Sequence, residues 1–256
     1  HKKIIENIDI GGPAMVRAAA KNYNDVTVIT SPEQYSEFVT ELKNNKGTTS
    51  LKFRKKMSQI AFTETAYYDT VISNYFNNIT NTTFPKKKII QANLIEKLRY
   101  GENPHQNASI YSQNGELKLN VIHGKKLSFN NYNDIFAALT ISKNFPKNTG
   151  TVIVKHTNPC GASILKDKLD SYLSALACDP LSAFGGIVSC NFKIDKKLAL
   201  ELGKIFLEVI IGNGFEKDAL KILKLKKNIR IIDASNFSLN EVFKFHSIND
   251  AILLQN

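Results

Sequence analysis

The first third of the chain shows helical spacing of apolar residues on both sides of one short apolar run. Pro13 suits the first turn of a helix that continues to Lys21. The apolar run at 26–30 predicts a buried strand, and the Ser-Pro-Glu-Gln segment that follows predicts a capped helix lasting to about Asn44. Apolar residues then recur at helical spacing over 50–76, which predicts one long helix or two abutting ones.

Beyond a polar stretch at 80–88, which ends in a lysine run and is the expected domain boundary, the pattern changes. Short strands and helices alternate, and Asn114-Gly115 predicts a hairpin between its two flanking strands. We expect strands at 108–111, 117–122, 151–154, 186–190 and 209–211, and helices at 134–143, 169–178, 196–208 and 217–226. This alternation predicts a mixed α/β fold.

Composition limits the class of protein. The chain has 256 residues, of which 43% are hydrophobic, enough for a sizeable core. No apolar run reaches the roughly 18 residues of a membrane span, and residues 1–6 resemble neither a signal peptide nor a transit peptide. We therefore expect a cytoplasmic protein that does not bind membranes. Because His1 stands where Met would, we expect a processed, tagged or fragmentary chain.

The net charge of +11 raises nucleic acid as a partner. The lysines are scattered, however, and Asn and Ile are abundant throughout, so a general compositional bias is the better interpretation and no nucleic-acid partner is expected. Steep salt dependence of polynucleotide binding would indicate the other alternative. Cys160, Cys178 and Cys190 form no CxxC pair, which favours free thiols in a reducing compartment and no structural zinc.

The strongest candidate for chemistry is Lys155-His156, which directly follows a predicted buried strand. Ligand sites in open α/β sheets collect at the carboxyl ends of strands. A histidine can accept a proton from a weak amine nucleophile, and a neighbouring lysine can lower the pKa of that histidine or stabilise negative charge. A polar turn would explain His156 alone, but the pair before a Pro- and Gly-containing turn favours function.

Three other segments have both functional and structural explanations. The stretch at 98–106 combines Arg99 and Tyr100, which suit phosphate or carboxamide binding, with turn formers typical of a surface loop. The stretch at 179–186 ends in two glycines, which indicate either close approach to a ligand or the end of a helix. Asp9 and Lys21 lie on either side of Gly11-Gly12-Pro13 and fit a functional ion pair or an ordinary surface one.

Taken together, six segments resemble, in the same order and at matching separations, the bifunctional phosphoribosylaminoimidazolecarboxamide formyltransferase and inosine monophosphate (IMP) cyclohydrolase family. They are ENIDIGGP from Glu6, RAAAKN from Arg17, LRYGENPHQ from Leu98, VKHTNPCG from Val154, DPLSAFGG from Asp179 and EVII from Glu208. The resemblance covers essentially the whole chain.

The resemblance implies a fold and a division of the chain. Residues 1–89 would be the C-terminal part of a cyclohydrolase domain of methylglyoxal-synthase-like fold. Residues 90–256 would be the first half of a transformylase region with a cytidine-deaminase-like fold that has lost its zinc. It also implies an enzyme of purine biosynthesis that works as a homodimer with shared transformylase sites.

The resemblance further implies the reaction and the residues. A formyl group would pass from 10-formyltetrahydrofolate to 5-aminoimidazole-4-carboxamide ribonucleotide (AICAR), and ring closure would give IMP. His156 would be the base and Lys155 would assist as the formyl group leaves, while Asp9 and Lys21 match catalytic residues of the cyclohydrolase. The residues implied to line the nucleotide site are Arg99, Tyr100, Asn130, Phe184, Gly185 and Glu208.

Parts of the family pattern are expected to lie outside this chain, namely the first half of the cyclohydrolase domain and the second transformylase half. A catalytically inactive fragment or nucleotide-binding module of the same family is therefore the alternative. We expect Asp9 and Lys21 to approach each other in space. We also expect no bound metal, because Cys160 lacks a second cysteine at the spacing of a zinc deaminase.

Overall fold

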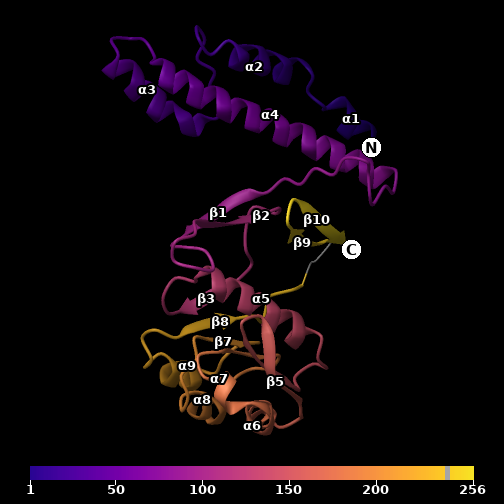
Figure 1. The fold of residues 1–256 in the computed structure, drawn as a ribbon, viewed down its shortest axis with the longest axis vertical. Coiled ribbons are helices and arrows are strands. Elements are labelled where there is room, and N and C mark those ends of the chain that lie inside the picture. The colour runs from indigo at the N-terminus through magenta and orange to yellow at the C-terminus, as the bar shows by residue number, and fades with distance from the viewer. Residues whose placement is uncertain (240–242) are drawn as a thin grey trace. The chain divides into compact units, whose positions relative to one another are not determined.

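The computed structural model describes residues 1–239 and 243–256, and the chain divides into two compact units, 1–92 and 93–256 (Figure 1). Each unit is described by itself. Among the described residues, no helix combines the length and the apolar character needed to cross a membrane.

All regular elements of the first unit are helices. Its elements are α1 (Lys2–Glu6), α2 (Gly11–Lys21), the 3-10 helix η1 (Pro32–Gln34), α3 (Tyr35–Asn44) and α4 (Leu51–Ile79). The predicted start at Ser31 is confirmed, since its hydroxyl accepts from the Glu33 amide and the Gln34 side chain closes a capping box. The stretch predicted as one or two helices is the single 29-residue helix α4.

The long helix α4 is the support against which α2 packs. Phe53, Met57 and Ala61 on α4 and Ala20 on α2 are buried. The buried Ser58 hydroxyl also donates to the carbonyl oxygen of Ala20 at 2.6 Å. Apolar contact and this one buried hydrogen bond together fix α2 along α4.

The predicted strand at 26–30 is wrong. This segment forms no strand, and its residues are all half-buried. A strand needs a partner for its backbone groups, and residues 1–92, all of which the structure describes, contain no other extended segment that pairs with it. Side chains bind some of the backbone groups of this segment instead, since the Gln34 side chain accepts a hydrogen bond from the Thr30 amide.

The second unit is built on a mixed six-stranded sheet in the order β3-β8-β7-β6-β4-β5. Its strands are β3 (Asn120–His123), β4 (Gly150–Lys155), β5 (Asn158–Ile164), β6 (Ile187–Cys190), β7 (Val209–Gly212) and β8 (Arg230–Asp233). The three strands β6, β7 and β8 are mutually parallel, whereas β3 and β4 run antiparallel to them. The predicted apolar strands β4, β6 and β7 are confirmed.

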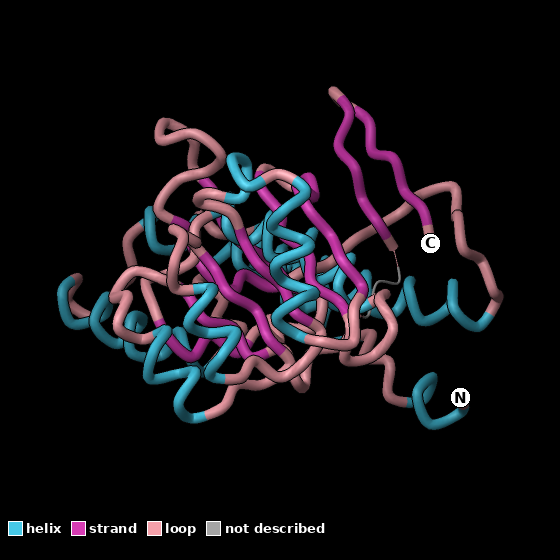
Figure 2. Tube along the Cα trace, turned by 90° about the horizontal axis from the view of Figure 1, so that it is seen from below, coloured by secondary structure: helices cyan, strands magenta, loops and turns pink. Residues whose placement is uncertain are grey.

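Helices cover both faces of this sheet (Figures 1 and 2). Helix α5 (Phe129–Lys143) packs on one face, where Ile135, Ala138 and Leu139 meet Val152 and Ile211 among others. The opposite face is covered by α6 (Lys168–Cys178), α7 (Pro180–Ala183), α8 (Lys196–Leu202) and α9 (Lys217–Leu223). The structure therefore has the predicted mixed α/β character.

The predicted hairpin around Asn114-Gly115 is wrong. The chain does turn there, with Gly115 at φ +77°, but the two flanking strands pair elsewhere. Strand β2 (Ala108–Ser112) pairs with β1 (Asn93–Leu98), and β3 pairs with β8. Strand β1 was missed because its sequence, NLIEKL, lacks strict alternation.

Two helix boundaries differ from prediction by five residues or more. Helix α5 begins at Phe129, five residues before the expected Asp134, because Ser128 provides its N-cap. Helix α8 ends at Leu202, where Gly203 follows, and not at Glu208. Glu208 consequently lies in the loop immediately before β7. A final hairpin of β9 (Lys244–Ile248) and β10 (Ala251–Gln255) completes the described structure.

A buried asparagine provides the first stability prediction. The Asn191 side chain is 5% exposed and accepts from the Thr149 and Gly150 amides while donating to the Phe145 and Pro146 carbonyls. Asn191→Ala leaves these groups without partners and should lower the free energy of unfolding by about 2 to 4 kcal/mol. Urea denaturation measures this. The control Asn144→Ala removes one exposed hydrogen bond, and equal losses in both variants would contradict the argument.

A buried tyrosine provides a prediction that depends on pH. Burial raises the pKa of Tyr172 to about 12, and its hydroxyl has no hydrogen-bond partner in the described structure. An ordinary phenol has a pKa of about 10, so the neutral core tyrosine stabilises the fold below about pH 10 and loses this contribution as the pH rises through about 12.

Tyr172→Phe should therefore keep or slightly raise stability at neutral pH, within about 1 kcal/mol, and flatten the fall in stability at alkaline pH. Urea denaturation across the alkaline range measures both effects. The exposed Tyr111→Phe is the matched control. A Tyr172→Phe variant whose alkaline loss matches that of wild type would overturn the assignment.

Candidate active site

One end of the six-stranded sheet collects most of the candidate residues. Strand β4 runs antiparallel to β6, so its carboxyl end lies beside the amino ends of the parallel strands. Val154 pairs with Ile187, Ile187 with Val209, and Val209 with Arg230. Lys155 and Glu208 therefore stand at the same sheet end as Arg230. The candidate residues of β4 thus lie at its carboxyl end, where ligands often bind in α/β sheets, whereas its neighbours contribute their amino ends.

His156 lies at the tip of the β4–β5 hairpin. The residues predicted as a polar turn do form one, with His156 at φ 52° and Thr157 at φ 64°, and the chain continues into β5. The His156 carbonyl accepts from the Thr157 hydroxyl at 2.7 Å and from the Asn158 side-chain amide at 3.0 Å. The His156 side chain is exposed, so the imidazole is available to a substrate.

Lys155 is held against the stretch at 179–186. Its Nζ donates to the Phe184 carbonyl oxygen at 2.7 Å. The next residue, Gly185, has φ +75°, a conformation that favours glycine, and its amide donates to the Phe206 carbonyl. The Phe184 ring packs on Phe206 with 5.4 Å between centroids. This places the Lys155 ammonium group at the backbone of Phe184, whose side chain is exposed.

Glu208 is fixed by two partners from other elements. Its carboxylate accepts from the Asn131 side-chain amide at 2.7 Å and from the Arg230 guanidinium at 3.3 Å. Asn131 is 3% exposed, whereas its neighbour Asn130 is exposed and donates to the Glu102 carbonyl. The Arg230 Nε is buried without a hydrogen-bond partner in the described structure. Glu208 and Arg230 thus form a half-buried charged pair at the sheet end.

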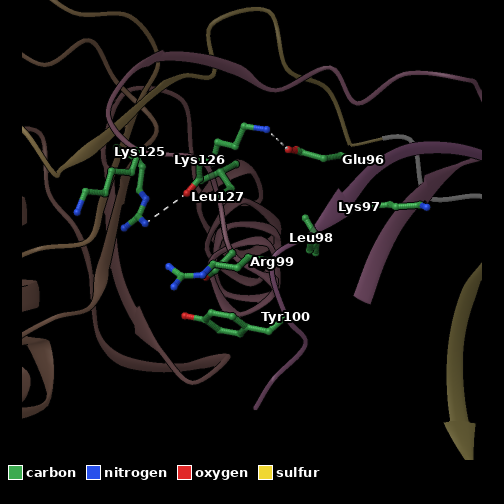
Figure 3. A pocket seen from close by; sticks show the side chains of 10 residues that line it. Glu96, Lys97, Leu98, Arg99, Tyr100, Lys125, Lys126 and Leu127 are labelled. Carbon is green, nitrogen blue, oxygen red and sulfur yellow. Dashed lines mark hydrogen bonds and ion pairs between the residues drawn. The ribbon is translucent and has the colours of Figure 1, made fainter. Parts of the chain in front are cut away.

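A cavity of about 470 Å³ adjoins this pair within the second unit. Arg99, Tyr100, Lys126 and Arg230 are among its lining residues. Figure 3 shows the Arg99 guanidinium and the Tyr100 ring extending in the same direction, with Lys97 pointing away. The Arg99 Cζ lies 5.8 Å from the centre of the Tyr100 ring. A cavity with several cationic side chains and one aromatic ring suits a phosphorylated heteroaromatic ligand.

The loop that carries Arg99 and Tyr100 is closed on itself by Gln106. The Gly101 amide donates to the Gln106 carbonyl at 2.8 Å, and the Gln106 side chain accepts from the Asn103 amide at 2.8 Å. Some of the polar residues at 98–106 therefore have a structural role, since they hold the loop in its conformation.

Neither the thiols nor the acidic side chains gather into a metal site among the described residues. The three cysteines are free, and no group of three His, Cys, Asp or Glu side chains converges within 1–239 and 243–256. Burial raises the pKa of the Cys160 thiol, and the nearby Lys155 ammonium only partly opposes that shift. Cys160 is therefore a neutral thiol near pH 7, unsuited as a nucleophile. That the protein needs no metal stays a prediction.

The expected approach of Asp9 and Lys21 is wrong. Asp9 precedes α2 and accepts from the Gly12 amide at 3.1 Å, while Lys21 is the last residue of that helix. The ten steps of about 1.5 Å from Gly11 to Lys21 separate the two ends of α2 by roughly 15 Å. No ion pair joins the two among the residues described. Direct contact between Asp9 and Lys21 therefore does not support a shared catalytic role for these two residues.

Sequence reasoning missed Asn131, Asp134 and Arg230. Asp134 Oδ1 accepts from the Thr157 amide at 2.7 Å, so it contacts the turn that carries His156. The sequence feature that could have indicated Asn131 and Asp134 is Ser128, which is the N-cap of α5. A helix begun there places residues 131 and 134 on one face, three apart. Arg230 begins a short strand of only four residues, and only the sheet order brings it to Glu208.

Comparison with known proteins shows which family the chain resembles. The family model described as AICARFT/IMPCHase bienzyme matches residues 19–256. The bifunctional purine biosynthesis protein PurH of Listeria monocytogenes is 42% identical over 259 residues, covering 99% of this chain. PurH of Persephonella marina is 46% identical over 263 residues, also covering 99%.

The chain spans about half the length of these relatives, 50% of the Listeria protein and 51% of the Persephonella protein. A third relative, PurH of a Thermoanaerobacter species, is 46% identical over 90% of the chain and 46% of its own length. Because the family model and the relatives together extend over nearly every residue, the chain belongs to the AICARFT/IMPCHase bienzyme family.

Proposed function

We propose that this chain is part of an enzyme of purine biosynthesis that formylates AICAR and closes the product to IMP. The observation that carries the proposal is the gathering of Lys155, His156, Phe184, Gly185 and Glu208 at one sheet end. Through its bond to Glu208, Arg230 links this end to the cavity lined by Arg99 and Tyr100. Family membership supports the same reaction.

In this proposal the amine nitrogen of AICAR attacks the formyl carbon. The exposed His156 imidazole removes a proton from that amine nitrogen. The carbon–nitrogen bond to 10-formyltetrahydrofolate then breaks, and the folate nitrogen gains a proton. Lys155 assists this departure, because its ammonium lies at the Phe184 carbonyl beside the turn and can stabilise negative charge on the formyl oxygen. Ring closure of the formylated nucleotide, with loss of water, would follow.

The nucleotide is assigned to the cavity and the neighbouring sheet end. Arg99 offers the fork of donors that a phosphate requires, and Tyr100 and Phe184 offer aromatic faces. We include Asn130 and Glu208 with Gly185 in this site, although Asn131 is the residue that binds Glu208 directly. No residue besides Lys155 is assigned to the folate.

We propose that residues 1–89 belong to a methylglyoxal-synthase-like cyclohydrolase domain and residues 90–256 to a cytidine-deaminase-like transformylase half. The change from helices alone before residue 93 to strands and helices after it supports two different domains. Asp9 and Lys21 remain proposed cyclohydrolase residues that act from opposite ends of α2. A cytoplasmic homodimer with shared transformylase sites is proposed from the family, and three free thiols suit that compartment.

A nucleotide-binding piece without turnover is a second candidate for the chain by itself. The observation that favours it is the cavity with its cationic lining, which lies entirely within residues 93–256, so the chain itself contains a surface suited to a nucleotide.

The first functional prediction concerns the catalytic pair. In a polypeptide of the relatives' full length that carries these residues, His156→Ala should lower formyl transfer about a hundred- to ten-thousand-fold, because general-base catalysis contributes on this scale. Lys155→Ala should also slow transfer, and the double variant should be little worse than the worse single one if both act on one step. Steady-state kinetics of formyl transfer, together with the AICAR affinity of each variant, test this. Near wild-type turnover in His156→Ala would show that His156 is not the base.

The second functional prediction concerns the nucleotide. Arg99→Ala should weaken AICAR or IMP binding by about ten- to a hundredfold, because it removes a charge-assisted contact to phosphate. Isothermal titration calorimetry on the 256-residue chain measures this and also tests the binding-module alternative. Lys118→Ala, which removes an exposed charge outside the cavity, is the matched control. Unchanged affinity in Arg99→Ala would place the phosphate elsewhere.

A further inference from the structure

The turn that carries His156 has an unfavourable backbone conformation. Lys155 pairs with Asn158, so His156 and Thr157 are the two central residues of a two-residue hairpin loop, both at positive φ. Such loops prefer Asn-Gly, since residues with a Cβ are disfavoured at positive φ and β-branched ones most of all. Each residue held in this conformation makes the loop less stable. A conformation of this kind persists only where other contacts hold it.

One contact from outside the hairpin holds this turn. The Thr157 amide donates to Asp134 Oδ1 at 2.7 Å. The other hydrogen bonds of the turn, from the Thr157 hydroxyl and the Asn158 side chain to the His156 carbonyl, lie within the hairpin and move with it. Within the described residues, the Asp134 bond is thus the one hydrogen bond that ties His156 or Thr157 to another element.

Asp134 is itself held firmly. It is half-buried on α5, and the next residue, Ile135, is fully buried against the sheet. One turn earlier on the same helix, Asn131 binds the Glu208 carboxylate. The helix therefore positions the turn with His156 and the carboxylate of Glu208 relative to each other, through two side chains three residues apart.

We propose that Asp134 is a positioning residue for His156. By accepting the Thr157 amide hydrogen, its carboxylate holds the strained loop in the conformation that presents the imidazole to the substrate amine. Asp134 acts through the backbone of the loop and takes no part in proton transfer. This inference rests on the proposed function of His156 and adds a residue that supports it.

The test compares Asp134→Ala with Asp134→Asn in the full-length polypeptide. Asparagine keeps a side-chain oxygen that can accept from Thr157 but removes the charge, whereas alanine removes the acceptor. Asp134→Ala should lower kcat for formyl transfer by about ten- to a hundredfold with little change in KM for AICAR, because misplacement of a catalytic group costs rate more than binding. Asp134→Asn should restore most of the rate. Asn133→Ala, an exposed neighbour on the same helix, is the matched control and should behave as wild type.

A second readout does not depend on activity. Hydrogen exchange of the Thr157 amide, followed by NMR on the 256-residue chain, should be fast in Asp134→Ala and protected in wild type, Asp134→Asn and Asn133→Ala. Loss of Thr157 protection without loss of kcat would overturn the positioning role while leaving the reaction in place. Equal loss of kcat in the Asn and Ala variants would also overturn it, since the charge and not the acceptor would then matter.

Failure of the proposed function is recognised separately. If the wild-type full-length polypeptide does not transfer a formyl group, or His156→Ala turns over normally, the proposed function fails whatever Asp134 does. In that case the exchange measurement still decides whether Asp134 fixes the loop.

Discussion

The packing of α5 on one face of the mixed sheet is the interaction on which the candidate site depends. Ile135, Ala138 and Leu139 are completely buried against strand residues such as Val152 and Ile211. Full burial of a large apolar side chain contributes about 1.5 to 3 kcal/mol, whereas a typical hydrogen bond contributes about 1 kcal/mol. The apolar contacts therefore fix the position of the helix. Asn131 and Asp134 reach Glu208 and the His156 turn only because that position is fixed first.

Strand direction determines which residues meet. Had β4 been parallel to β6, Lys155 and His156 would lie at the end of the sheet opposite Glu208 and Arg230. The short β4–β5 hairpin and the antiparallel pairing of β4 with β6 bring them to the same end. The edge position of β5 also accommodates Pro159, which cannot donate a hydrogen bond to a further strand.

Local patterns predicted much of this arrangement and failed where long-range pairing decides. The capped helix after Ser31 and the apolar strands β4, β6 and β7 follow from nearest neighbours, and the sequence was sufficient for them. The strand expected at 26–30 and the hairpin expected at Asn114-Gly115 depend on partners distant in the chain, which periodicity does not reveal. The same limit applies to the site. The sequence motif was enough to predict Lys155 and His156 as site residues. Arg230 contacts Glu208 only because β8 lies beside β7 in the sheet, which the motif does not reveal.

The His156 turn shows how function and local preference conflict within one sequence. A two-residue hairpin built for stability would contain Asn-Gly, yet here a histidine and a β-branched threonine occupy both positions at positive φ. Natural sequences depart from local preference mainly at functional sites, where other contacts offset the strain. The hydrogen bond from Thr157 to Asp134 links this loop to α5, whose Ile135 and Leu139 are fully buried against the sheet. The bond to α5 holds the backbone that carries His156 at an otherwise exposed hairpin tip.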